Sequence, residues 1–160
     1  MKTAVRCVDF ILKWTIILLM GFSVFNVLWQ VFTRFALNNP SSWTEEAARY
    51  LLIWVSLLAA VYAVRLNMHL AIDVLTERFT GSLQTVSRIV IQVCIFLFAL
   101  LVMAIGGMSL VNLTLTMSQT SPALNMKLGY VYSVLPISGC LIMFYTVVSL
   151  VDTFRNARSK

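Results

Sequence analysis

Residues 41–73 read SSWTEEAARYLLIWVSLLAAVYAVRLNMHLAID, a stretch that joins an acidic helix start, an apolar run and a polar stripe. No charged residue occurs from Tyr50 to Val64. A helix needs about 20 mostly apolar residues to cross about 30 Å of hydrocarbon. The stretch therefore predicts a membrane-spanning helix over about 44–66, with polar groups at both of its ends.

The whole chain has the composition of a membrane protein, since 60% of its 160 residues are hydrophobic and 11% are charged. Further apolar runs predict spans at about 14–35, 88–110 and 130–152. The segments between the spans are too short to bury a core of their own. We expect an all-α membrane protein with four transmembrane helices, in which residues 1–160 form a single integral membrane domain.

An amphipathic helix is predicted between the second and third spans, over about 69–84. Arg65, His69, Asp73 and Glu77 recur every four residues and so share one face of a continuing helix. Apolar residues follow helical spacing on another face, which favours a helix lying in the membrane interface. The polar stripe is then either the solvated face of that helix, with Arg65 extending from the end of the second span, or a seam that a second protein contacts.

The basic residues indicate how the chain is oriented, because Lys and Arg are more frequent in the cytoplasmic loops of membrane proteins. With both termini cytoplasmic, three basic residues lie outside, namely Arg34, Arg49 and Lys127, and the remaining nine lie inside. This asymmetry accounts for the net charge of +6 without a nucleic-acid partner. The first apolar run follows three basic residues but lacks a small-residue cleavage site, so we expect it to be a span and not a removed signal peptide.

The start of the second span carries a cluster of polar and aromatic side chains. Ser42 and Glu45 have the spacing of a capping box, and Glu45 and Glu46 lie near the positive end of the helix dipole. Arg49 can pair with either acid on one helix face. The cluster, together with Trp43, is either an ordinary capped helix start at the water interface or a contact surface for a partner.

The sequence argues against an enzyme and against a bound metal or cofactor. His69 is the only histidine, which excludes haem held between two histidines, a two-histidine metal site and a Ser-His pair. Three cysteines without a C-x-x-C spacing suggest neither a disulfide framework nor a thiolate site. The predicted spans hold no carboxylate in their interiors, whereas a transporter working alone would place charge near the bilayer midplane.

The order of several short motifs resembles a known family, the small membrane subunit (DctQ-type) of tripartite ATP-independent periplasmic (TRAP) transporters. The motifs are Arg34, Pro40, Trp43-Thr44-Glu45-Glu46-Ala47-Ala48-Arg49, Trp54, Arg65 with His69, Ile72-Asp73-Val74, Gln119-Thr120-Ser121-Pro122-Ala123-Leu124 and Leu135-Pro136-Ile137. The resemblance covers most of the chain and is weakest before residue 14 and after residue 150.

The resemblance implies a bacterial inner-membrane complex that takes up an organic acid with a sodium gradient, with sialic acid and C4-dicarboxylates among the candidates. The partners it implies are a large multi-span transport subunit, which this chain would brace, and a periplasmic substrate-binding protein, which it would help to dock. We expect Arg34, Trp43, Glu45, Glu46 and Arg49 at an outer contact, and Arg65, His69 and Asp73 at an inner stripe against the large subunit or lipid headgroups.

Two other classes of function stay open at the level of sequence. The chain could be the membrane anchor of a respiratory enzyme, although a single histidine argues against haem ligation. It could also be an autonomous small four-span exporter, although residues 14–35 lack the buried acid on which such exporters depend.

Overall fold

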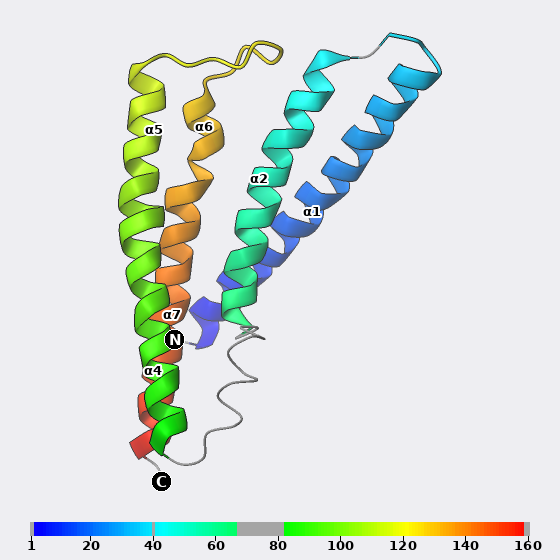
Figure 1. Cartoon of the computed structure of the whole chain (residues 1–160). Helices are drawn as coiled ribbons and strands as arrows, with labels where there is room; N and C mark the ends of the chain where they lie inside the picture. Colours follow the sequence, from blue (N-terminus) through cyan, green and yellow to red (C-terminus); the bar gives the residue numbers. More distant parts are fainter. Residues whose placement is uncertain (1, 40, 67–81, 159–160) are drawn as a thin grey trace. The chain divides into compact units, whose positions relative to one another are not determined.

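The computed structural model describes the backbone of residues 2–39, 41–66 and 82–158, and it is helical throughout most of these ranges (Figure 1). The elements are α1 (Lys2–Phe35), α2 (Ser42–Arg65), α4 (Ser82–Phe98), the π-helix η1 (Ala99–Gly106), α5 (Gly107–Thr116), α6 (Leu128–Tyr132) and α7 (Val134–Arg158). Within the described ranges there is no β-strand, and Thr120 and Lys127 form an isolated antiparallel bridge. The predicted all-α class is confirmed.

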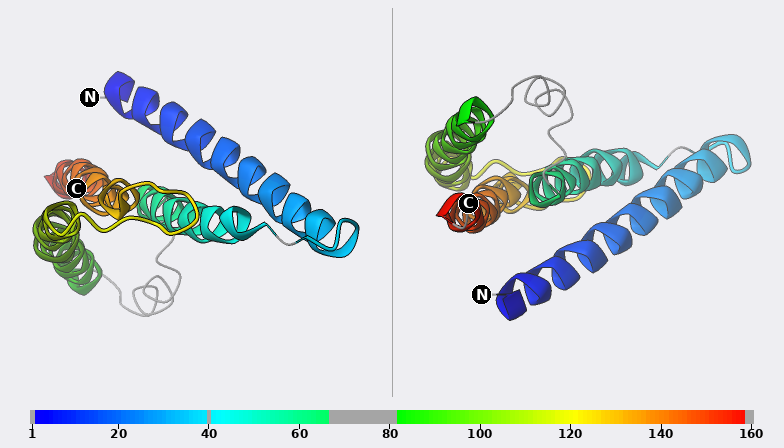
Figure 2. Two further views of the ribbon diagram at one scale, coloured as in Figure 1. Left: turned by 90° about the horizontal axis from the view of Figure 1, so that it is seen from above. Right: turned by 90° about the horizontal axis from the view of Figure 1, so that it is seen from below.

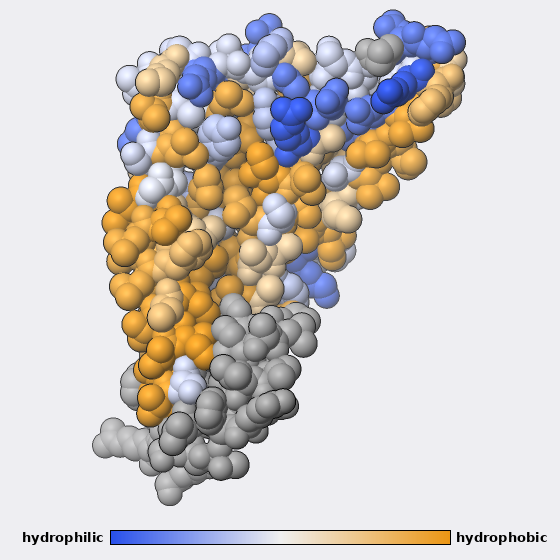
Figure 3. Space-filling view, viewed as in Figure 1, coloured by the Kyte–Doolittle hydropathy of each residue, from blue (hydrophilic) through white to orange (hydrophobic). Residues whose placement is uncertain are grey.

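Among the described residues, four helical segments are long and apolar enough to cross a membrane. These segments are Val5–Phe35, Ser42–Arg65, Ile89–Thr116 and Leu128–Val151. Figure 3 shows apolar residues over the length of the helices and polar residues gathered near the loops that follow α1 and α5. The four predicted spans are therefore confirmed, although the first begins earlier and the third ends later than predicted.

The third span continues to Thr116 because its polar residues bond within the helix. The hydroxyl of Thr114 donates to the Leu110 carbonyl at 2.9 Å, and that of Thr116 donates to the Asn112 carbonyl at 2.8 Å. A threonine that bonds to its own helix exposes less polarity than its sequence suggests. The polar residues after residue 110 suggest a loop, but the hydroxyls of Thr114 and Thr116 bond within the helix, and the segment is helical as far as Thr116.

The predicted interfacial helix over about 69–84 lies almost entirely outside the described residues, as do His69 and Asp73. Ser82, Leu83 and Gln84 are described and already belong to α4. The interfacial helix stays a prediction.

The chain divides into two compact units, of which the first comprises Met1–Tyr62 and Ser109–Val134. In this unit α1 and α2 lie close together where α1 ends and α2 begins, and they diverge away from there (Figure 2). The indole Nε1 of Trp54 on α2 donates to the Val131 carbonyl of α6 at 3.0 Å. Gly129 of α6 lies so close to α5 that an added Cβ would be 2.5 Å from the Leu115 Cγ.

The second unit comprises Ala63–Met108 and Leu135–Lys160. Gly139 of α7 packs against η1, where an added Cβ would lie 2.9 Å from the Met103 Cβ and 3.0 Å from the Ala104 backbone nitrogen. Small residues allow this close approach of helices in a membrane. Pro136 is the third residue of α7, a position in the first turn where its missing N–H removes no intrahelical hydrogen bond.

Candidate functional site

The start of α2 is held by a hydrogen-bonded pair of hydroxyl side chains. The Thr44 hydroxyl donates to the Ser41 carbonyl at 2.7 Å, so the Ser41 hydroxyl is the donor in its own 2.7 Å contact with Thr44 Oγ1. Since α2 begins at Ser42, Ser41 occupies the N-cap position. The predicted capping box on Ser42 and Glu45 is wrong, because Ser42 is already helical.

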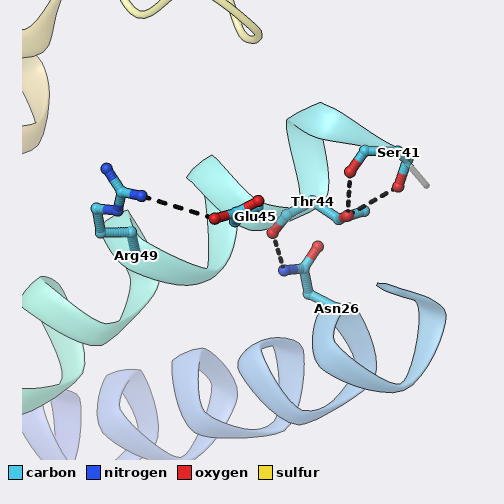
Figure 4. Close-up of polar contacts among 5 residues, drawn as sticks. All are labelled: Asn26, Ser41, Thr44, Glu45 and Arg49. Carbon is cyan, nitrogen blue, oxygen red and sulfur yellow. Dashed lines mark hydrogen bonds and ion pairs between the residues drawn. The ribbon is translucent and has the colours of Figure 1, made fainter. Parts of the chain in front are cut away.

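A second contact ties the same turn to α1. Asn26 is 3% exposed, and its Nδ2 donates to the Thr44 backbone carbonyl at 2.8 Å. Figure 4 shows the nitrogen of the Asn26 amide facing Thr44, with the amide oxygen on the other side. The first turn of α2 therefore lies beside α1 at Asn26, and the buried amide of this residue fixes the pairing of the two helices.

Glu46 anchors the loop that connects α5 and α6. Its Oε2 accepts hydrogen bonds from the Ser121 hydroxyl and from the Ala123 backbone N–H, the latter at 3.2 Å. Both donors are more than 70 residues away in the sequence. Hydrogen bonds to a charged acceptor are stronger than those between neutral groups. Glu46 is thus bonded within the chain, and the ion pair of Arg49 is formed with Glu45.

The anchored loop is also ordered by hydrogen bonds of its own. The Ser121 N–H donates to the Met126 carbonyl at 2.9 Å, and the Asn125 N–H donates to the Ser121 carbonyl at 3.0 Å. Asn125 adopts a φ of 51°, a left-handed conformation that asparagine tolerates better than most residues. The result is a compact loop over residues 119–128 that is fixed to α2 through Glu46. Because the basic residues predict that this loop lies on the outer side, it is named the outer loop.

Glu45 and Arg49 form the local pair that their spacing predicts. The Arg49 Nη2 lies 3.9 Å from the Glu45 Oε1 (Figure 4), and the two side chains are 67% and 69% exposed. An exposed i, i+4 pair contributes only about 0.3 to 0.5 kcal/mol. Both side chains therefore remain accessible to another molecule.

Trp43 and Arg34 lie on the surface in the same unit. Trp43 lines a cavity of about 250 Å³ together with Phe22, Phe25, Asn26 and Trp29 of α1. The Arg34 guanidinium lies 5.9 Å from the ring centroid of its neighbour Phe35, at the end of α1.

Arg65, the first residue of the predicted inner stripe, belongs to the second unit. Its guanidinium lies 5.8 Å from the ring centroid of Tyr145 on α7, a side chain that is almost fully buried. This geometry is a cation–π contact. The stripe can be followed no further, because His69 and Asp73 lie outside the described residues.

Sequence reasoning missed Asn26, Ser121 and Ala123, the groups that fix the start of α2 and the outer loop. No local spacing links them to their partners, although Ser121 and Ala123 lie within the Gln119–Leu124 motif that carried the family resemblance. Within the part of the chain that the structure describes, no three His, Cys, Asp or Glu side chains gather as metal ligands. The cluster offers exposed charge, aromatic surface and a fixed loop, which are the features of a contact surface.

The chain is similar in sequence to several transporter proteins. The isethionate TRAP transporter permease protein DctMQ of Oleidesulfovibrio alaskensis is 36% identical over 96 residues, which are 60% of this chain and 15% of that protein. A putative TRAP transporter small permease protein of Haemophilus influenzae is 29% identical over 127 residues, 79% of this chain and 77% of that protein. The sialic acid TRAP transporter permease protein SiaT of Haemophilus influenzae is 36% identical over 73 residues, 43% of this chain and 12% of that protein.

The share of each relative's length that this chain matches separates the relatives into two kinds. The chain spans only 15% and 12% of DctMQ and SiaT, whereas it spans most of the small permease protein. A family model described as tripartite ATP-independent periplasmic transporters, DctQ component, matches residues 23–156, from within α1 into α7. The resemblance carried by the motifs is confirmed, and the chain belongs to the DctQ component family of TRAP transporters as a multi-pass membrane protein.

Proposed function

We propose that this chain is the non-catalytic small membrane subunit of a sodium-coupled TRAP transporter for an organic acid. It braces the large transport subunit in the bacterial inner membrane and helps to dock the periplasmic substrate-binding protein. The observation that carries the proposal is the family match over residues 23–156.

The similarity to segments of longer permeases supports the pairing with a large subunit. The matched segments are 15% of DctMQ and 12% of SiaT, so in each of those proteins a related sequence belongs to a much longer permease chain. The names of these relatives include isethionate and sialic acid, both of which are organic acids. Sialic acid and C4-dicarboxylates remain candidate substrates for this chain, and isethionate joins them.

The outer loop and the exposed pair beside it support the docking role. Because Glu46 and the loop's own hydrogen bonds fix residues 119–128, a soluble protein would meet a surface that needs little ordering on binding. Glu45 and Arg49 add accessible charges of both signs at the start of α2. In this proposal Glu46 acts indirectly by holding the loop, while Arg49, Glu45, Arg34 and Trp43 are available for contact.

The orientation of the chain follows from its basic residues. Both termini are cytoplasmic and the outer loop is periplasmic, because three basic residues then lie outside and nine inside. A reporter enzyme that is active only in the periplasm, fused within residues 119–128 or after residue 158, tests this directly. Activity from the loop fusion alone is expected, and activity from the C-terminal fusion alone would contradict it.

Uptake measurements test the function as a whole. The chain is co-expressed with the products of its neighbouring genes, and sodium-driven uptake of sialic acid, a C4-dicarboxylate and isethionate is measured separately with and without this chain. Uptake of one acid that requires both sodium and this chain is expected. Unchanged uptake in its absence, or transport by the purified chain alone in liposomes, would overturn the proposal.

A substitution refines the docking role. Arg49→Ala should lower uptake, mainly at low concentrations of the binding protein, because an exposed charge at a contact acts mostly on association. Arg49→Lys, which keeps the positive charge at the same position, is the matched control and should retain uptake. Equal uptake by Arg49→Ala and the unchanged chain would show that the Glu45–Arg49 pair has no role in docking.

A further inference from the structure

We propose that the start of α1 binds one anionic phospholipid, with the lipid phosphate at Arg6 and part of an acyl chain in the cavity beside it. The cavity has a volume of about 320 Å³, and the described residues that line it are Arg6, Cys7, Phe10 and Ile11. This lipid site lies in a part of the chain that the proposed function does not use, and it does not depend on that function.

The lining residues give the cavity an apolar wall with one charged end. They follow the i, i+1, i+4, i+5 spacing of a helix and so share one face of α1. Phe10 and Ile11 are each 64% exposed, and Arg6 and Cys7 are exposed as well. The cavity volume lies at the lower end of the ~300 to 1,000 Å³ of ligand pockets. An apolar surface with a guanidinium at its N-terminal end suits a chain-like ligand that carries an anionic group.

The cavity lies at the level where lipid headgroups meet hydrocarbon. The apolar segment Val5–Phe35 has 31 residues and is therefore about 46 Å long at ~1.5 Å per residue. This length exceeds the ~30 Å of hydrocarbon and reaches the ~40 to 45 Å of a bilayer with its headgroups. Arg6 is the second residue of the segment, which places it at the level of the phosphates, while Phe10 and Ile11 lie about one turn deeper.

The charges at this end of α1 favour an anion. Lys13 follows Arg6 by seven residues, so the two lie on the same side of the helix, and both are exposed. Among the described residues Arg6 forms no ion pair. Asp9 lies between them in sequence and already interacts within the chain. A guanidinium can bind two phosphate oxygens through parallel N–H bonds, which makes Arg6 the group that holds the phosphate.

An anionic phospholipid satisfies both parts of the site with one molecule. A zwitterionic lipid also has acyl chains and a phosphate, but its headgroup ammonium would lie near Arg6 and Lys13 and oppose the attraction. A free phosphate ion would bind the guanidinium and leave the apolar wall uncovered. The combination of charge, apolar wall and depth therefore favours the anionic lipid.

Photo-crosslinking in vesicles tests the site. The full chain is reconstituted with phosphatidylglycerol that carries a diazirine in its acyl chain and, in parallel, with phosphatidylcholine that has the same acyl chains. Adducts on peptides that contain residues 7–13 should be about fivefold more abundant with phosphatidylglycerol, which corresponds to about 1 kcal/mol for one basic residue. Adducts at Leu18, which is 66% exposed farther along α1, should not differ between the lipids. Equal yields at residues 7–13, or the same preference at Leu18, would overturn the proposal.

Substitutions show whether Arg6 causes the preference. Arg6→Gln should abolish it, because the variant keeps the apolar wall and loses the guanidinium, whereas Arg6→Lys should keep part of it. Lys127→Gln, which removes one positive charge from the outer loop, is the matched control and should keep the full preference. All yields are expressed per amount of folded chain. A preference that survives Arg6→Gln, or that Lys127→Gln also abolishes, would overturn the role of Arg6.

Inorganic phosphate distinguishes a lipid headgroup from a free anion. Added in excess, it should leave the phosphatidylglycerol adducts at residues 7–13 unchanged, because it has no acyl chain to cover Phe10 and Ile11. Loss of these adducts in its presence would show a site for free phosphate and overturn the lipid proposal.

Discussion

The first unit has several hydrogen bonds between groups distant in sequence and one closely packed glycine, Gly129, whereas the second unit has two closely packed glycines beside one such hydrogen bond, from Gln92 to Ser149. Asn26, Glu46 and Trp54 each make such a hydrogen bond in the first unit. Gly107 and Gly139 instead allow close contact in the second unit, where an added Cβ would meet neighbouring atoms at 3.0 and 2.9 Å. The comparison indicates that polar bonds contribute more to the first unit and steric fit contributes more to the second, so the two units should differ in their response to the same kinds of substitution.

The largest effect is expected from Gly139→Ala, which inserts a methyl group against η1. It should cost about 1 to 3 kcal/mol, because the nearest atoms include the backbone of Ala104, which cannot rotate away. In detergent this corresponds to a thermal midpoint lower by about 2 to 10 °C.

Two alanine controls make the glycine prediction specific. Gly129→Ala should cost less although its methyl would lie closer, 2.5 Å from Leu115 Cγ, because a leucine side chain can change rotamer. Gly21→Ala, with nothing within 4 Å, should be neutral or slightly stabilising. If Gly129→Ala were the most harmful of the three, steric fit would matter more in the first unit than in the second.

Glu46→Ala should release the outer loop. Loss of both hydrogen bonds from Ser121 and Ala123 leaves the loop held only by its own bonds, so tryptic cleavage after Lys127 should become about five- to tenfold faster. Glu45→Ala is the matched control, because it removes an acid of the same turn whose ion-pair partner is the exposed Arg49. Equal cleavage of the two variants would show that Glu46 does not hold the loop.

Trp54→Phe should have a smaller effect on the same unit. The ring is retained and the 3.0 Å bond to the Val131 carbonyl is lost, at a cost of about 1 kcal/mol. The thermal midpoint should fall by about 2 to 4 °C. Trp14→Phe, which removes an indole N–H that bonds to none of the described residues, should leave the midpoint unchanged; an equal fall in both variants would indicate a general effect of losing an indole.

Gln92→Leu in the second unit should have the smallest effect. The Gln92 Nε2 donates to Ser149 Oγ at 2.7 Å, while its buried Oε1 has no partner among the residues that the structure describes. Losing the bond and losing the unpaired acceptor act in opposite directions, so the free energy of unfolding should change by less than about 1 kcal/mol. A large loss, measured by thermal unfolding, would mean that a polar bond also specifies this unit.

The fold could be predicted from the sequence because membrane spans depend on the length and hydropathy of local segments. The end of the third span could not be predicted from hydropathy, because the hydroxyls of Thr114 and Thr116 donate to carbonyls of their own helix and this polar segment is therefore helical. The Glu45–Arg49 pair was also predictable, because an i, i+4 spacing fixes it. The partner of Glu46 was not, because Ser121 lies 75 residues away and nothing in the local pattern points to it.

The same separation in sequence has a consequence during synthesis. Asn26 and Thr44 are 18 residues apart and can pair as soon as the first two helices have been made. Ala123 follows Glu46 by 77 residues, a delay of about 4 to 15 s at ~5–20 residues per second. During that interval the Glu46 carboxylate lacks the donors that it has in the complete chain, so α2 and the loop over residues 119–128 are joined only after the first two helices have been made.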